Sequence, residues 1–209
     1  MTDSNLRQQA ILLVLTGVFA LACLIGSPYP KLAPLQNLPT LFVLAVAWLG
    51  LRRFPMPTSA IACFCLFLAL HTLGGRYIYS NVPYDAWFSA IGLPAPTELF
   101  HFERNHYDRI VHFSFGLLML HPLAEGLARF TRLSRGWATY VAIEFVLAGS
   151  ALYEIFEWGL TLTMAGENAD AYNGQQGDIW DAQKDMALAF AGAIVAALFL
   201  RLRGRSATD

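Results

Sequence analysis

Hydrophobic residues are concentrated in six long segments of the chain, separated by shorter polar stretches. The segments cover residues 9–26, 36–51, 58–75, 109–128, 137–160 and 186–202. A helix needs roughly 17–25 largely apolar residues to cross a bilayer, and the second and sixth segments lie at the short end of that range. The pattern therefore predicts an all-α, polytopic bundle of about six transmembrane helices, with residues 1–209 forming a single integral membrane domain.

The composition also indicates a membrane protein. Of the 209 residues, 56% are hydrophobic and 14% are charged, and the mean hydropathy is +0.45. A soluble domain of this size is much less apolar. We therefore expect membrane lipids as partners, and no basic stripe in the sequence favours nucleic acid. The sequence leaves the oligomeric state open.

Arginine residues gather on one side of the predicted bundle. The side that includes both termini carries Arg7, Arg52, Arg53, Arg129, Arg132, Arg135, Arg201, Arg203 and Arg205 in short flanks. The opposite side carries Lys31, Arg76, Arg104, Arg109 and Lys184, spread over longer loops. Because basic residues are enriched in cytoplasmic loops, both termini are predicted to lie in the cytoplasm, giving an N-in/C-in topology.

The long loop between the third and fourth segments, residues 76–108, is rich in aromatic residues and proline. Aromatic rings favour the headgroup level of a membrane, which predicts an interfacial helix near Tyr84 to Ile91. The alternative is a surface loop that an aromatic belt anchors.

Small residues recur along the sixth segment, at Ala189, Gly192, Ala193 and Ala197. Small side chains let the backbones of two membrane helices approach closely. We therefore expect the sixth helix to pack tightly against a neighbour.

With this topology, polar clusters at the ends of four helices fall on the same, periplasmic face. The clusters are His71 with Arg76; Asp108 with Arg109 and His112; Glu154 with Glu157; and Asp178 with Asp181, Lys184 and Asp185. If the last helix begins near Asp178, its three carboxylates share one face of that helix. A carboxylate at the bilayer centre costs about 2.5–3.5 kcal/mol on insertion scales, so such residues indicate function or paired charges.

In one interpretation the clusters form a metal-dependent hydrolase or transferase that acts on a lipid or envelope intermediate. Imidazole and carboxylate ligands suit a divalent zinc, manganese or iron ion. The predicted metal ligands are His71, Asp108, His112, Asp181 and Asp185. Catalytic roles are assigned to Glu154, Glu157 and Asp178, and binding of an anionic headgroup to Arg76, Arg109 and Lys184. A metal there would activate water or polarise an ester or phosphoryl oxygen.

Two non-enzymatic interpretations compete with the metal site. The same residues could form an interhelical network of salt bridges and hydrogen bonds that locks the bundle. They could also belong to a proton or solute pathway, which His121, Glu125 and Glu144 would have to extend toward the cytoplasm. The excess of acids over bases favours the metal site, because a purely structural network needs more cations.

Four motifs in order resemble the YjdF-like family of bacterial inner-membrane proteins. They are His71-x-x-Gly-Gly75-Arg76-Tyr77, Asn105-x-x-Asp108-Arg109-x-x-His112-Phe113, Tyr153-Glu154-x-x-Glu157-Trp158 and Gly177-Asp178-x-x-Asp181-x-x-Lys184-Asp185-Met186. The resemblance covers nearly the whole chain and implies a multi-pass protein of the inner membrane. It implies no particular reaction.

A weaker similarity to the VanZ-like pattern covers the last two segments. It consists of Glu154-x-x-Glu157, Asp181-x-x-x-Asp185 and Gly192, where Glu157 replaces a glutamine and Asp185 replaces an asparagine. Leu188 stands where the first glycine is usual. The similarity implies work on the cell envelope, as an analogy of pattern only.

Overall fold

The computed structural model describes residues 3–162 and 175–206, and in these residues all of the regular structure is helical. The long helices are α1 (Asp3–Leu24), α2 (Ala33–Gly50), α3 (Thr58–Arg76), α6 (Tyr107–Phe130), α7 (Arg135–Thr161) and α9 (Asp181–Ser206). Each is long and apolar enough to cross a membrane. The predicted all-α bundle with six spans is therefore confirmed.

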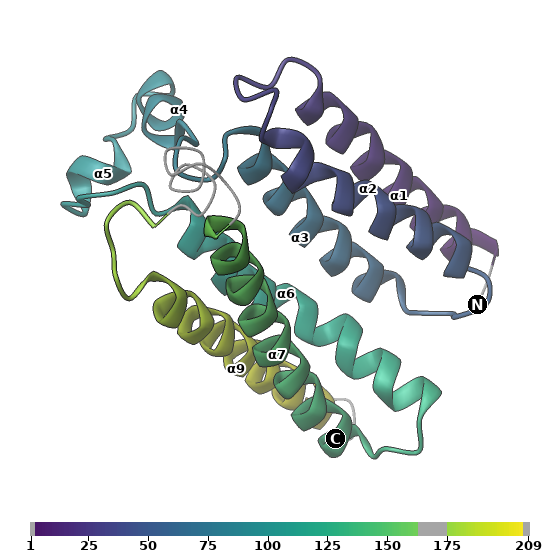
Figure 1. The fold of residues 1–209 in the computed structure, drawn as a ribbon. Helices are drawn as coiled ribbons and strands as arrows, with labels where there is room; N and C mark the ends of the chain where they lie inside the picture. The colour runs from purple at the N-terminus through teal and green to yellow at the C-terminus, as the bar shows by residue number, and fades with distance from the viewer. Residues whose placement is uncertain (1–2, 163–174, 207–209) are drawn as a thin grey trace.

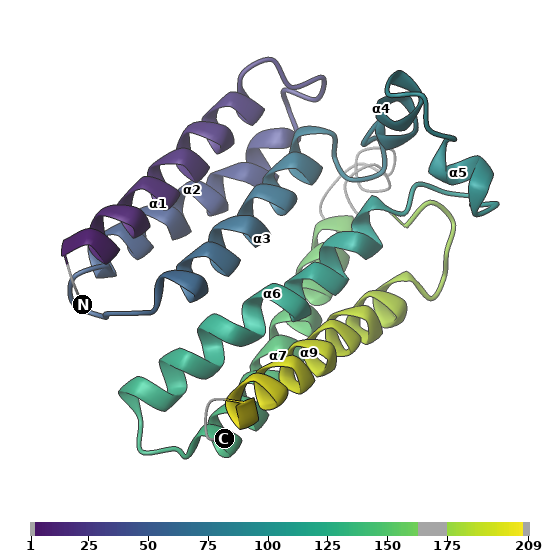
Figure 2. The ribbon, with the colours of Figure 1, turned by 180° about the vertical axis from the view of Figure 1, so that it is seen from behind.

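Two groups of three helices make up the bundle (Figure 1). Helices α1, α2 and α3 pack on one another, and α6, α7 and α9 form the second group. The groups are joined through the contact between α3 and α6, as the reverse view also shows (Figure 2). Helices α2 and α7 lie on the same face of this contact, and their backbones do not pack against each other.

Two short helices, α4 (Tyr84–Ala90) and α5 (Pro96–Leu99), lie together at one end of the bundle (Figure 1). Helix α4 coincides with the helix predicted near Tyr84 to Ile91, and its position at the membrane interface stays a prediction. Both chain termini lie at the opposite end of the bundle, which agrees with an even number of spans (Figures 1 and 2). The assignment of that end to the cytoplasm stays a prediction from the arginine distribution.

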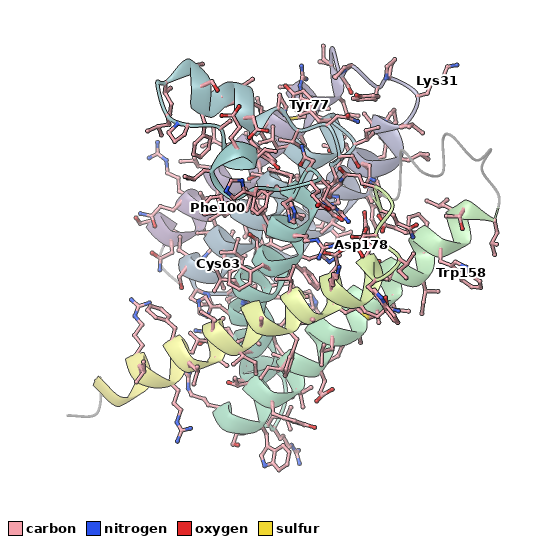
Figure 3. The ribbon with its side chains drawn as sticks, turned by 90° about the vertical axis from the view of Figure 1, so that its left-hand side faces the viewer. Lys31, Cys63, Tyr77, Phe100, Trp158 and Asp178 are labelled. Carbon is pink, nitrogen blue, oxygen red and sulfur yellow. The ribbon has the colours of Figure 1, made fainter. Side chains whose placement is uncertain are left out.

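Helix α9 begins at Asp181, so the prediction of a helix from about Asp178 was wrong. Gln176 and Gly177 have positive φ angles of 48° and 85°, and the chain therefore turns before the helix. The Asp178 backbone N–H donates to the Gln175 carbonyl, and its carboxylate accepts the Trp180 N–H. Asp178 thus shapes the turn that leads into α9 (Figure 3) rather than continuing the carboxylate stripe of the helix.

The contact between α6 and α9 depends on two glycines. A Cβ atom built on Gly116 would lie 1.8 Å from the Ala189 carbonyl oxygen, and one on Gly192 would lie 2.1 Å from the Phe113 carbonyl oxygen. The backbones therefore touch directly, and Ala189 and Ala193 are fully buried beside them. The close packing predicted from the small residues of the sixth segment is confirmed.

Candidate functional site

The site is built by the register in which α6 and α9 run parallel. Gly116 meets Ala189 at the closest approach of the two helices. One turn closer to the N-terminus of both helices, His112 of α6 lies beside Asp185 of α9. One further turn in the same direction, Arg109 at the start of α6 contacts Asp181 of α9. The residues on each helix are three or four apart, so a single packing register brings every pair together.

The carboxylates of the site divide into two sets, and the first set is paired with basic side chains. The Asp181 carboxylate accepts hydrogen bonds from Arg104 at 2.5 Å and from Arg109 at 2.8 Å. The Asp178 carboxylate accepts from Arg109 at 2.7 Å and from Lys184 at 2.7 Å. This set is the salt-bridge network of the structural interpretation, with interhelical pairs that tie the turn before α9 to α6.

Asp178 lies outside the spans, and its pKa is lowered from the ordinary value of 3.8 to about 2, chiefly by the hydrogen bond from Lys184. A folded-state pKa below the unfolded one means that the ionised form stabilises the fold. We expect this contribution to be complete above about pH 4 and to disappear as the pH falls toward 2. The difference in melting temperature between the wild type and Asp178→Asn, followed in detergent, should therefore be constant from neutral pH to about pH 5 and shrink below pH 4. A difference that grows on acidification would contradict this assignment.

The second set of acids forms no salt bridge with arginine or lysine in the described residues, although Arg104 and Arg109 lie near enough to attract the Asp108 carboxylate. Asp108, His112 and Asp185 each offer one ligand atom, and these atoms lie within 4.8 Å of one another. The three residues are only 7%, 7% and 1% exposed. His112 Nε2 lies 3.6 Å from the nearer Asp108 oxygen. Together these residues form the Asp108–His112–Asp185 triad.

Two glutamates of α7 add further negative charge beside the triad. The Glu154 Oε1 atom lies 3.5 Å from His112 Nε2, and the Glu154 side chain is 11% exposed. Glu157 follows one turn later, close enough to Asp108 and Glu154 for like-charge repulsion. One imidazole cannot balance so many buried carboxylates, so bound protons or a cation must supply the missing charge.

The donor set of the triad fits a divalent cation. The buried Asp185 Oδ1 atom has no hydrogen-bond partner within the described part of the chain, which leaves a lone pair available. Ligand atoms at about 2.0–2.2 Å from a tetrahedral zinc lie roughly 3.3–3.6 Å apart, so atoms of the triad that are 4.8 Å apart must approach by about 1 Å to share one ion. Mixed carboxylate and imidazole ligands on facing helices are typical of metal sites in bundles.

The structure places the other predicted metal ligands and cations elsewhere. His71 bonds through Nε2 to the Gln36 carbonyl at 3.2 Å and through Nδ1 to the Tyr79 hydroxyl. Arg76 donates to four carbonyl oxygens at the end of α1, those of Ala22, Cys23, Ile25 and Gly26. Arg109 and Lys184 line an open polar hollow of about 640 Å³ on the outer side of the paired set.

The adjacent glycines of the first motif serve packing. A Cβ atom on Gly74 would lie 2.7 Å from the Tyr79 ring, and one on Gly75 would lie 2.8 Å from the Asn37 side chain. Tyr79 itself has a positive φ of 53°, which turns its ring back over α3 toward His71. The motif therefore fixes the end of α3 against α2.

Three polar residues that hold the site were not predicted as site residues: Gln36, Arg104 and Asn105. Arg104 supplies the shortest bond to Asp181. The Asn105 side chain caps the Tyr107 N–H at 3.0 Å and donates to the Val82 carbonyl, which holds the start of α6. The excess of acids over bases in the sequence could have indicated Arg104, because the three aspartates of the last motif need more cations than Arg109 and Lys184 supply.

The residues proposed for a pathway toward the cytoplasm do not continue the site. His121 Nε2 bonds to the Ser59 hydroxyl at 2.9 Å. Glu125 pairs with Arg129 at 2.9 Å and with Arg135 at 3.1 Å, and Glu144 is exposed on the outer surface of α7. These contacts are local and give the transport interpretation no support.

A cavity of about 440 Å³ leads from the triad into the membrane-spanning region. Residues of α2, α3, α6 and α7 line it, and Asp108, His112 and His71 lie at its polar end. The cavity therefore connects the unpaired carboxylates to an apolar space between the two groups of helices.

The fold and these groups define a multi-pass helical membrane protein with a buried carboxylate and histidine centre. The family model described as "Predicted membrane protein (DUF2238)" matches residues 8–206, and the chain belongs to this family. Inner membrane protein YjdF of Escherichia coli (strain K12) is 32% identical over 193 residues, which are 91% of this chain and 84% of the relative. No solved structure matches the chain. The predicted family and the inner-membrane location are confirmed.

Proposed function

We propose that the Asp108–His112–Asp185 triad binds one divalent cation and that the protein is a metal-dependent hydrolase or transferase of the inner membrane. The observation that carries the proposal is that these buried acids form no salt bridge with arginine or lysine in the described residues, whereas Asp178 and Asp181 share three such partners, Arg104, Arg109 and Lys184. A bundle that needed only a structural network would pair both sets in the same way.

A cation in the triad would act as a Lewis acid or would lower the pKa of a bound water. Glu154 lies within 3.5 Å of His112 and is placed to accept a proton from that water or to complete the ligand set. Glu157 is placed one turn further along the same face of α7. With the N-in/C-in topology this chemistry takes place near the periplasmic leaflet, on an ester or phosphoryl group of a lipid or envelope intermediate.

Elemental analysis of the detergent-purified protein tests the cation. We expect about one zinc, manganese or iron ion per chain in the wild type and less than a tenth of that in Asp185→Asn, because the variant removes a charged ligand. Asp178→Asn is the matched control, since it removes a carboxylate of the paired set and should keep the metal.

Circular dichroism and gel filtration of both variants show whether the fold is intact. A folded wild type that takes up no stoichiometric metal after incubation with each of the three ions would contradict the proposal. Equal loss of metal in both variants would place the cation in the paired set instead of in the triad.

A further inference from the structure

The cavity next to the triad has two apolar walls that belong to different halves of the bundle. Leu35, Pro39 and Val43 follow one another at four-residue spacing on α2, and Leu152 and Phe156 do so on α7. The α2 and α7 backbones do not pack on each other, and α3 and α6 close the floor of the cavity between them. One side-chain hydrogen bond crosses the cavity, from the Tyr153 hydroxyl of α7 to the Gln36 Oε1 atom of α2 at 3.3 Å.

The cavity opens toward lipid rather than toward water. The wall residues at its rim are exposed, and both walls belong to membrane-spanning helices. Its volume of about 440 Å³ falls in the range of about 300–1,000 Å³ that is usual for small-molecule sites. A ligand that enters sideways from the hydrocarbon must carry a lipophilic part.

Three buried polar side chains interrupt the apolar lining. Gln36, Thr40 and Ser150 are each 2% exposed, and Thr40 Oγ1 and Ser150 Oγ have no hydrogen-bond partner in the residues that the structure covers. The Gln36 Oε1 atom accepts from the Tyr153 hydroxyl, which leaves Gln36 Nε2 as a third donor without an acceptor in those residues. All three groups can donate a hydrogen bond, and buried donors left without an acceptor are costly. They therefore indicate a ligand that brings acceptor oxygens into the cavity.

The order of groups along the cavity matches the order of groups along a glycerolipid. The triad lies at the outer end, and Ser150 is one helical turn further in than Glu154 on α7. Gln36 and Thr40 are one turn apart on α2, and Phe67, Phe115 and Val43 surround the deeper space. A phospholipid presents a charged headgroup, then ester carbonyl oxygens, then an acyl chain.

We propose that the cavity binds one acyl chain of a glycerophospholipid, whose ester carbonyl oxygens accept hydrogen bonds from Gln36, Thr40 and Ser150. The placement of the headgroup at the triad rests on the proposed function, whereas the binding of the chain and of the esters does not. The ester carbonyl oxygens distinguish this ligand from a polyprenyl phosphate, which has acceptor oxygens on its phosphate but no ester carbonyl.

Photolabelling tests the proposal with the whole protein in liposomes of phosphatidylethanolamine. The probe is a diacyl phosphatidylglycerol with a diazirine in one acyl chain, and labelled peptides are mapped by mass spectrometry. We expect labelling to concentrate on residues 35–43 and 149–156, and to fall at least about fivefold in Val43→Trp, which fills the cavity. Val46→Trp is the control, because Val46 is also exposed on α2, at 52% against 39% for Val43, but lies outside the cavity.

A second comparison isolates the ester contacts. Thr40→Val keeps the shape of the side chain and removes its donor, so it should lower labelling by the ester probe several-fold and leave labelling by the matching diether probe unchanged. Labelling spread evenly over all lipid-facing helices, or unchanged by Val43→Trp, would overturn the proposal. So would equal effects of Thr40→Val on both probes.

Metal content of the same samples separates the two proposals. The protein could hold no metal and still show labelling at the cavity that Val43→Trp abolishes. That result would support the lipid cavity and contradict the metal-dependent function. A protein that binds its metal but shows only even labelling would support the metal centre and overturn the lipid cavity.

Discussion

Gly116→Ala is expected to destabilise the protein by more than about 3 kcal/mol, because overpacking a tight core forces backbone shifts. The added Cβ would lie 1.8 Å from the Ala189 carbonyl oxygen, and a carbonyl in a helix cannot move aside without moving the helix. Helix α9 must then separate from α6, which also takes Asp185 away from His112. Thermal unfolding in detergent and gel filtration measure the loss of stability.

Gly126→Ala is the matched control on the same helix. Its added Cβ would meet only the end of the Met56 side chain, at 3.9 Å. Alanine is a better helix former than glycine by about 1 kcal/mol, so this variant should be as stable as the wild type or more so. Equal behaviour of the two alanine variants would contradict the close contact of α6 with α9.

Arg109→Met is expected to destabilise the fold by about 3–5 kcal/mol, the loss found when one partner of a buried ion pair is removed. Arg109 bonds to both Asp178 and Asp181, and its side chain is only 14% exposed. Adding Asp178→Asn to the variant should restore part of the stability, because it removes one of the carboxylates left without a partner. Chemical unfolding of the three proteins in detergent gives the comparison.

Arg129→Met provides the contrast at the other end of the bundle. Arg129 is 44% exposed where it pairs with Glu125, and such surface pairs contribute about 0–1 kcal/mol. An Arg109→Met protein as stable as the wild type would show that the paired set does not hold the fold together. It would return Arg109 to the role of binding an anionic headgroup.

The six spans were predictable because the hydrocarbon of the membrane imposes length and apolarity on each of them. The segment predicted at residues 58–75 and the helix observed at Thr58–Arg76 differ by one residue at one end. The prediction failed at Asp178, where the spacing of the acids suggested a helix but the side chain stabilises a turn. Spacing alone cannot separate these two cases.

The division of the acids into two sets was not predictable, because no single segment of the sequence shows which helices are neighbours in the bundle. Asp181 and Asp185 are one turn apart on α9, yet Asp181 pairs with two arginines and Asp185 faces His112. The register of α6 on α9 decides this, and Gly116 and Gly192 fix that register. Gly192 was recognised as a packing residue in the sequence, but its partner helix was not.

The placement of His71 also depends on tertiary structure. In the sequence it is one more histidine at the outer end of a span, equivalent to His112. In the structure, the Gln36 carbonyl and the Tyr79 hydroxyl occupy both of its ring nitrogens. The turn that brings Tyr79 back over Gly74 uses positive φ angles at Ile78 and Tyr79, and the residue types there give no sign of it.

X-ray absorption at the edge of the bound metal tests the central claim most directly, because it identifies the ligands of the cation. A cation bound at the triad should show a shell of oxygen atoms with a single imidazole nitrogen, and the imidazole signal should disappear in His112→Gln and persist in His71→Gln. The His71 variant is the control, since His71 lines the same cavity without belonging to the triad. A shell without imidazole in the wild type, or one unchanged by His112→Gln, would contradict a metal centre at the Asp108–His112–Asp185 triad.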